Sequence, residues 1–265
     1  MLLWVTTILI GYFTFKWFLG KLKVKNYGEK YVLVTGCDTG FGNLLVKRLD
    51  GLGFHVIAAC LKQDAADELK KTSSERLQTL QLDVTSEDDI KGNKKINILH
   101  LYNVFIGLWA VVNNAGIGGA IGPIECLNRK DYIDTLAVNL FGVIDVTKMF
   151  LPLIRKARGR VVNIASMLGR IALVPAPYCV SKYGVEAFSD SLRRTYAIQC
   201  VIRAFCPSSS ATAYTLFEFQ PCTMGLVFPS QLNCHPSLTY ENNSEKSRET
   251  VLGQHRNLTR DLLFH

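Results

Sequence analysis

The sequence predicts an α/β protein built on a doubly wound parallel sheet, with an incomplete or altered C-terminal part. Short runs rich in valine and isoleucine alternate with amphipathic segments between residues 31 and 205, which is typical of β-α-β units. A glycine-rich turn follows the first run, and the alternation is lost beyond residue 206. With 48% apolar and 20% charged residues, a chain of 265 residues can bury a sizeable core. Right-handed crossovers between such strands give a Rossmann-like fold.

Each element follows from its local pattern. "YVLVTG" at 31–36 predicts a strand, and "NLLVKRLDGLG" at 43–53 predicts a helix that ends in glycines. The two faces of this helix are expected to be an inward set, Leu44, Leu45 and Leu49, and an outward set, Lys47 and Arg48. The remaining expected elements, in chain order, are a strand at 54–61, a polar helix at 64–72, strands at 77–85 and 108–116, a helix at 129–150, a strand at 159–166, a helix at 177–196 and a strand at 200–205.

The first twenty residues predict a membrane anchor. "MLLWVTTILIGYFTFKWFLG" is almost wholly apolar, with Lys16 as its only charge, and twenty helical residues span about 30 Å, the thickness of a bilayer core. The stretch lacks the charged start and the small-residue cleavage site of a signal peptide. The basic "KLKVK" that follows places the rest of the chain in the cytosol by the positive-inside rule. The alternatives are a buried first helix and a cleaved leader of a secreted protein.

The net charge of +8 is concentrated in the first thirty residues and in a cluster at 155–160. Basic clusters of this kind favour a membrane-facing flank. No zinc-finger or RNA-binding signature accompanies them, so nucleic acid is not an expected partner. The eight cysteines include no C-x-x-C pair and are expected to pack as isolated thiols, which predicts neither a metal site nor a disulfide framework.

The stretch "TGCDTGFG" at 35–42 predicts a dinucleotide site. It follows a strand and opens a helix, where Gly36, Gly40 and Gly42 allow a tight turn and a close approach to a pyrophosphate at the helix N-terminus. The acid that often binds the ribose lies about twenty residues further on in such folds. Here Lys62 would suit a 2′-phosphate and Asp64 a free hydroxyl, so the choice between NAD and NADP stays open.

Two further strand ends carry polar residues at the edge where such sheets bind their ligands. Asp83 either accepts a hydrogen bond from an adenine amino group, with Val84 flanking the ring, or caps the next helix. In "NNAG" at 113–116, Asn113 and its neighbours either bond adjacent loops and leave room for a cofactor, or form a plain turn.

Tyr178 and Lys182 share one helix face because they lie at i and i+4. A nearby ammonium favours the phenolate form of a tyrosine. A phenolate can take the hydroxyl proton of an alcohol as its hydride leaves for nicotinamide. Alone, Y-x-x-x-K is a weak signal, Ser166 reads as a strand-end cap and Asn139 as a polar residue inside a helix. As a set behind the glycine-rich turn, Ser166 is expected to hold the substrate oxygen and Asn139 to hold a water or fix its helix beside the lysine.

These motifs resemble those of the short-chain dehydrogenase/reductase superfamily, in which "TGCDTGFG", "LDVT", "NNAG", "VNLFG" and "YCVSK" occur in this order and spacing. The sequence is more similar still to the membrane-anchored retinol and hydroxysteroid dehydrogenases, through "HVIAACL", "RGRVVNIAS" and "YCVSKYGVEAFSDSLRR", over residues 28–91 and 107–194. The resemblance implies a catalytic set of Asn139, Ser166, Tyr178 and Lys182. It implies a cofactor site made of Gly36, Asp38, Thr39, Gly40, Phe41, Gly42, Lys62, Asp83, Val84, Asn113, Ala115, Gly116, Tyr178 and Lys182.

The same resemblance implies an enzyme that uses NAD, with NADP as the alternative. Its reaction would transfer hydride between nicotinamide and a lipophilic alcohol or ketone, such as retinol or a hydroxysteroid. The resemblance further implies a protein of the endoplasmic reticulum membrane, with one N-terminal anchor at 1–20, a cytosolic domain and a homodimeric assembly.

Two departures from the family pattern shape the expected organisation. Residues 91–106, "KGNKKINILHLYNVFI", lack the pattern of the charged amphipathic helix that the family has there. The likeness ends after Arg194, and Ser208 stands where the family has a glycine beside the nicotinamide. We therefore expect a catalytic domain at 28–206 and a divergent tail at 207–265. The alternative function is a catalytically impaired relative that binds the cofactor or a partner.

Overall fold

The computed structural model describes residues 4, 6–7, 10–15, 26–91, 107–173, 175–196 and 199–203. All of them belong to one compact unit, Met1–Val227, and a second unit, Phe228–His265, lies outside the described residues. The predicted tail at 207–265 and the departure at 92–106 also lie outside them, so these two expectations stay predictions.

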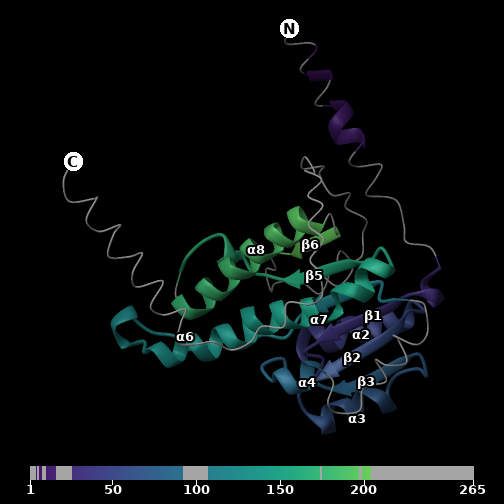
Figure 1. Ribbon diagram of the computed structural model, residues 1–265, viewed down its shortest axis with the longest axis horizontal. Helices are drawn as coiled ribbons and strands as arrows, with labels where there is room; N and C mark the ends of the chain where they lie inside the picture. The colour runs from purple at the N-terminus through teal and green to yellow at the C-terminus, as the bar shows by residue number, and fades with distance from the viewer. Residues whose placement is uncertain are drawn as a thin grey trace, which may run out of the picture. The chain divides into compact units, whose positions relative to one another are not determined.

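A six-stranded parallel sheet forms the centre of the described part, in the order β3-β2-β1-β4-β5-β6. Figure 1 traces this order from β3 at one edge to β6 at the other. The order reverses between β1 and β4, which is the switch point where doubly wound sheets bind ligands. The predicted fold class is confirmed. The strands are β1 (Tyr31–Thr35), β2 (His55–Cys60), β3 (Leu77–Gln81), β4 (Ala110–Asn113), β5 (Arg160–Ile164) and β6 (Gln199–Arg203).

Side chains of the inner strands β1, β2 and β4 alternate between two cores, one on each face of the sheet. On β1, Val32 and Val34 join the core under α2 (Gly40–Gly51) and α3 (Gln63–Lys71). Leu33 points the other way, into the core under α7 (Gly142–Lys156) and α8 (Ala176–Tyr196). Strands that are buried on both faces explain why the sequence shows continuous apolar runs instead of alternation.

Helix α2 begins at Gly40, three residues before the predicted start, because the last three residues of the glycine-rich stretch form the first turn of the helix. Leu45 and Leu49 are buried as expected, but the expectation for Leu44 was wrong, since its side chain is 59% exposed. Val46 takes the inward position instead. A short helix α4 (Glu87–Lys91), which the alternation did not predict, follows β3.

The helix predicted at 129–150 is longer and is interrupted by a π-helical turn. It consists of α6 (Arg129–Leu136), the π turn η3 (Ala137–Phe141) and α7. Among the described residues it is the helix long and apolar enough to cross a membrane, with a mean hydropathy of 1.6 over its most apolar window. Its α7 part packs on the sheet through residues such as Val146 and Phe150, so it is a core helix.

The predicted anchor at 1–20 falls largely outside the described residues. Trp4, Thr6, Thr7 and residues 10–15 are helical. The apolar side chains among them are exposed: Trp4, Ile10, Tyr12, Phe13 and Phe15. The anchor therefore stays a prediction.

Candidate active site

A cavity of about 330 Å³ opens at the carboxyl ends of β1 and β4. Strand ends at the switch point are where such a sheet presents backbone N–H groups and helix N-termini to a ligand. Eight of the predicted cofactor residues line the cavity: Gly36, Asp38, Thr39, Phe41, Asp83, Val84, Ala115 and Gly116. Five lining residues were missed by the sequence analysis: Leu61, Leu82, Asn114, Ile117 and Val138.

The glycine-rich turn at the cavity needs glycine at two positions. Gly36 has φ +68°, and a Cβ added to it would lie 2.7 Å from Cα of Ala115. A Cβ on Gly42 would lie 2.3 Å from the carbonyl oxygen of Gly36. Both distances are far too short for a side chain, so the turn can pack against β4 only because these side chains are missing.

Hydrogen bonds from the end of β4 lock it to the end of β1. The backbone nitrogens of Asn114 and Ala115 both donate to Oγ1 of Thr35, at 3.1 Å each. Nδ2 of Asn114 donates to the carbonyl oxygens of Thr35 and Gly36, at 2.9 and 3.0 Å. Asn114 therefore both lines the cavity and holds the glycine-rich turn.

Asn113, which was predicted at the cofactor, lies below the cavity and does not line it. Its side chain is buried, and Nδ2 donates to Oγ1 of Thr147 at 2.9 Å and to Oδ1 of Asn163 at 2.8 Å. Asn163 in turn donates to Oγ of Ser189 on α8 at 2.7 Å. Because side chains alternate along a strand, only one of two adjacent asparagines can face the cavity.

Asp38 connects the glycine-rich turn to the end of β2. Its carboxylate accepts hydrogen bonds from the backbone nitrogens of Leu61 and Lys62, both at 2.9 Å. Asp38 and Leu61 line the cavity, whereas Lys62, which was expected at a 2′-phosphate, does not. At the end of β2 the cavity is therefore lined by the carboxylate of Asp38 from the glycine-rich turn and not by Lys62.

Of the two interpretations that the sequence left open for Asp83, the cap of the next helix is not borne out, since the amide of Asp89 in α4 donates to Oγ of Ser86, and the adenine contact stays a prediction. Oδ1 accepts from the backbone nitrogen and the hydroxyl of Thr85, at 2.8 and 2.7 Å, as a local turn residue does. Asp83 and Val84 also line the cavity.

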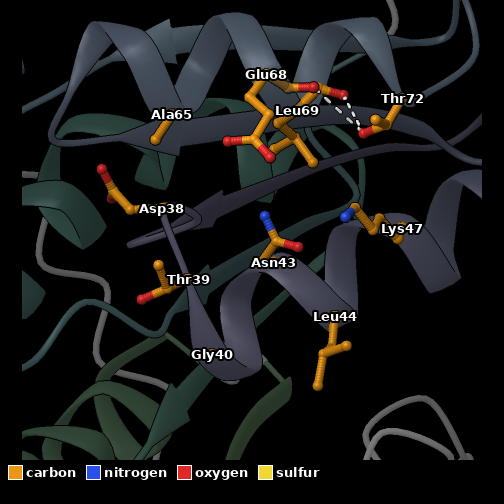
Figure 2. A pocket seen from close by; sticks show the side chains of 10 residues that line it. All are labelled: Asp38, Thr39, Gly40, Asn43, Leu44, Lys47, Ala65, Glu68, Leu69 and Thr72. Carbon is orange, nitrogen blue, oxygen red and sulfur yellow. Dashed lines mark hydrogen bonds between the residues drawn. The ribbon is translucent and has the colours of Figure 1, made fainter.

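A second cavity of about 420 Å³ lies between α2 and α3. Figure 2 shows Asn43 and Lys47 on α2 below it, and Glu68 and Leu69 on α3 above it. It shares Asp38, Thr39 and Gly40 with the glycine-rich turn, and none of the predicted catalytic residues lines either of the two cavities.

Lys182 is buried on α8, one turn after the half-buried Tyr178. Its Nζ donates to the carbonyl oxygen of Ile164 at 2.8 Å and lies 5.5 Å from the centroid of the Tyr178 ring. Burial lowers the pKa of the Lys182 ammonium from 10.5 to about 8. The group therefore changes charge close to neutral pH.

Asn139 lies at the centre of the π turn and is fully buried. Its amide accepts from the nitrogen of Ile117 at 2.8 Å and donates to the oxygen of Ile117 at 2.9 Å and to Oγ of Ser181 at 3.1 Å. A Cβ on Gly116 would lie 3.2 Å from Oδ1 of Asn139 and 3.8 Å from Nζ of Lys182. The fold thus brings the cavity wall, Asn139 and Lys182 together, at the kind of helix interruption that is frequent at functional sites.

Ser166 ends the β5 segment and caps the short 3-10 helix η4 (Met167–Gly169). Its Oγ accepts from the backbone nitrogen of Leu168 at 3.1 Å, which leaves the hydroxyl proton out of that bond. η4 packs against α8 at Gly169, where a Cβ would lie 2.9 Å from the carbonyl oxygen of Lys182. The residues predicted to be catalytic therefore come from β5, the π turn and α8, which meet at one end of the sheet.

A sequence model described as short chain dehydrogenase matches residues 30–219. The chain belongs to the short-chain dehydrogenase family. The resemblance inferred from the motifs is thereby confirmed.

Within this family the chain is similar to retinol and hydroxysteroid dehydrogenases. Retinol dehydrogenase 7 of Rattus norvegicus is 53% identical over 171 residues, which are 64% of this chain and 53% of the relative. The 17-beta-hydroxysteroid dehydrogenase type 6 of Homo sapiens is 49% identical over 183 residues, which are 69% of this chain and 57% of the relative. The chain thus spans little more than half the length of these relatives.

Two solved structures with bound nicotinamide cofactors share the fold. An NAD⁺-bound xylitol dehydrogenase superposes with a TM-score of 0.59 at 26% identity, covering 68% of this chain and 69% of that chain. ElxO with NADP bound superposes with a TM-score of 0.57 at 25% identity, covering 63% of this chain and 68% of that chain.

Proposed function

We propose that this short-chain dehydrogenase transfers hydride between a nicotinamide cofactor and a lipophilic alcohol or ketone. The observation that carries the proposal is the environment of Lys182. A lysine that is buried, bonded to Ile164, packed beside Gly116 and Asn139 and one helical turn from a tyrosine has no evident surface role. Strongly perturbed titratable groups at the edge of a cavity are typical of active sites.

In the proposed oxidation, Tyr178 is the base and Ser166 the group that holds the substrate. Oη of Tyr178, as phenolate, takes the hydroxyl proton of the alcohol, and the hydroxyl of Ser166 donates to the alcohol oxygen. Protonated Lys182, whose Nζ lies 5.5 Å from the ring centroid, stabilises the phenolate. Bound nicotinamide supplies the acceptor for the hydride that leaves the carbinol carbon. Reduction of a ketone uses the same groups in reverse.

The lining of the 330 Å³ cavity supports a dinucleotide as the ligand, and we propose NAD in preference to NADP. Gly36 and Gly42 leave the backbone open to a pyrophosphate at the N-terminus of α2. Asp83 and Val84 line the cavity, which supports the proposal that they hold the adenine. Asp38 would accept a hydrogen bond from a ribose hydroxyl and repel a 2′-phosphate. Asp38→Ala should therefore lower the affinity for NADH and reduce the ratio of NADH affinity to NADPH affinity. Lys62→Ala should change neither the NADH affinity nor this ratio.

Two observations support a retinoid or a steroid as the substrate class. The relatives are named for retinol and for 17-beta-hydroxysteroids. In addition, exposed apolar side chains follow both Ser166 and the cavity wall in the sequence: Met167, Ile171, Leu173, Ile117 and Ile121. Apolar surface at this end of the sheet suits an apolar substrate body.

The test is Tyr178→Phe, with Tyr183→Phe as the matched control. Tyr183 is an exposed tyrosine on the same helix, so its hydroxyl has no role in the proposal. We expect Tyr178→Phe to lower turnover of retinol or a hydroxysteroid by about 10²–10⁴-fold, the usual contribution of a positioned acid or base. NADH binding, followed by nicotinamide fluorescence, should be unchanged in both variants. Full turnover in Tyr178→Phe would sink the assignment.

For the whole protein we propose a membrane anchor at 1–20, a catalytic domain at 28–206 and a divergent tail at 207–265. We further propose that the protein forms a homodimer on the endoplasmic reticulum membrane, with the catalytic domain in the cytosol. The apolar, exposed side chains of the described N-terminal residues support the anchor. Protease protection in microsomes tests the orientation, and deletion of residues 1–20 should release the chain from membranes.

The second candidate is a cofactor-binding module without turnover. Ser208 favours it, because it stands where the family has a glycine beside the nicotinamide, and the family match itself ends at residue 219. The two functions differ in one measurement. A chain that NADH stabilises against thermal unfolding, but that converts neither retinol nor hydroxysteroids, supports the module.

A further inference from the structure

Arg170 and Glu186 form an ion pair beside the residues assigned to proton transfer. Glu186 lies on α8 one turn beyond Lys182, and its Oε2 is 2.7 Å from Nη2 of Arg170. The side chain of Glu186 is 8% exposed, and Arg170 is its one hydrogen-bonding partner among the residues that the structure describes. A carboxylate that is this deeply buried depends strongly on such a partner.

Arg170 directly follows η4, the short helix that begins at Ser166. The nitrogen of Gly169 donates to the carbonyl oxygen of Ser166 at 3.0 Å, and that of Leu168 donates to its Oγ at 3.1 Å. The nitrogen of Arg170 donates to the oxygen of Met167 at 3.0 Å. Because η4 binds both oxygens of Ser166, a movement of η4 against α8 also moves the hydroxyl that is proposed to hold the substrate.

Gly169 lets η4 touch the backbone of α8 directly. A Cβ on Gly169 would lie 2.9 Å from the carbonyl oxygen of Lys182 and 3.3 Å from Cγ of Glu186. The ion pair supplies a directional contact between the η4 segment and α8, in addition to the hydrogen bonds between the backbone of Leu173 and Sγ of Cys179.

We propose that Arg170 and Glu186 are positioning residues, which hold η4 on α8 and so keep the Ser166 hydroxyl in place relative to Tyr178 and Lys182. The catalytic consequence rests on the proposed function. The mechanical part does not, because the amides of Leu168 and Gly169 report the order of η4 without any turnover.

The experiment compares hydrogen exchange in Arg170→Ala, Glu186→Gln and Arg170→Lys. The matched control is Arg193→Ala, which breaks the pair between Arg193 and Asp190 on the same helix, also at 2.7 Å, whose carboxylate is 42% exposed. We expect the Leu168 and Gly169 amides to exchange at least about tenfold faster in Arg170→Ala and Glu186→Gln, with strand amides of β1 and β4 unchanged. Arg170→Lys should restore most of the protection, and Arg193→Ala should not change it.

A second readout is kinetic. Arg170→Ala and Glu186→Gln should lower kcat about tenfold while the Kd for NADH stays within about twofold, since misplacement of one substrate contact is costly but the cofactor cavity is untouched. If the wild-type chain shows no turnover, the proposed function fails and the exchange result still decides the positioning role. Unchanged exchange at Leu168 and Gly169 in both variants overturns the proposal, as does faster exchange shared equally with β1 and β4.

Discussion

Replacement of Lys182 by methionine tests whether burial in the folded protein disfavours the charged form of the lysine. Its pKa falls from 10.5 to about 8 because burial removes water from the ammonium. One pKa unit corresponds to about 1.4 kcal/mol, so the charged form costs the folded state about 3 kcal/mol. Methionine keeps much of the apolar stem and carries no charge, which removes this cost. It also loses the hydrogen bond to Ile164, an offset of about 1 kcal/mol that does not vary with pH.

The effect has a defined sign along the pH scale. Below about pH 8 the lysine is charged in both the folded and the unfolded chain, and the folded wild type bears the full cost. Between about pH 8 and pH 10.5 the unfolded chain binds more protons, so the stability of the wild type rises with pH. Above pH 10.5 the lysine is neutral in both states and the cost is gone. The variant's gain over the wild type should thus be largest at neutral pH, and in alkali the variant should be less stable than the wild type by about 1 kcal/mol, the value of the lost hydrogen bond.

The assay is urea unfolding of both cofactor-free proteins, under reducing conditions, from about pH 7 to about pH 11. The difference in unfolding free energy between variant and wild type should shift by about 3 kcal/mol over this range. Titrating groups that do not interact with Lys182 cancel in the difference. Lys130→Met is the control, because it makes the same substitution at a lysine whose side chain is 79% exposed. A Lys182→Met difference that changes with pH no more than the Lys130→Met difference would refute the burial argument.

Three further predictions concern residues around the cavity. Gly36→Ala should lower the free energy of unfolding by at least about 1–3 kcal/mol, because alanine is strained at a positive φ, and it should abolish NADH binding. The control is Gly51→Ala, whose added Cβ meets no atom within 4 Å and should change the free energy of unfolding by less than about 1 kcal/mol in the same urea assay. Asn113→Ala should lower the free energy of unfolding by about 1–3 kcal/mol, because the buried Oδ1 of Asn163 loses its hydrogen-bond donor. Calorimetry should find the affinity for NADH unchanged, and a loss of affinity would show that Asn113 contributes to the cofactor site. Thr35→Val removes the oxygen that accepts from two backbone N–H groups, so it should lower both the stability and the affinity for NADH. Thr35→Ser keeps the hydroxyl and should keep both properties. Equal behaviour of the two variants would contradict the role of the hydroxyl.

Much of the fold could be read from local patterns. Apolar runs at 31–36 and 159–166 became β1 and β5 within two residues, because a strand buried on both faces needs a continuous apolar run. Leu44 shows the limit of this reasoning. Helical periodicity alone allowed it on the inward face, but the sheet covers a narrower stripe of α2, and Val46 fills the position instead. The π turn around Asn139 was also out of reach, since one extra residue in a helix leaves no clear periodic signal.

The sequence by itself determined the order of strands and helices, the family, and the positions of Gly36, Tyr178 and Lys182 as candidates, because these depend on periodicity and on spacing within one element. Only the tertiary structure decided which neighbour of each motif reaches the cavity. Asn114 lines it and Asn113 does not, and of Asp38 and Lys62, which were both expected there, only Asp38 lines it. Such choices depend on the register between strands and on the face to which each side chain turns, and a difference of one residue reverses that face.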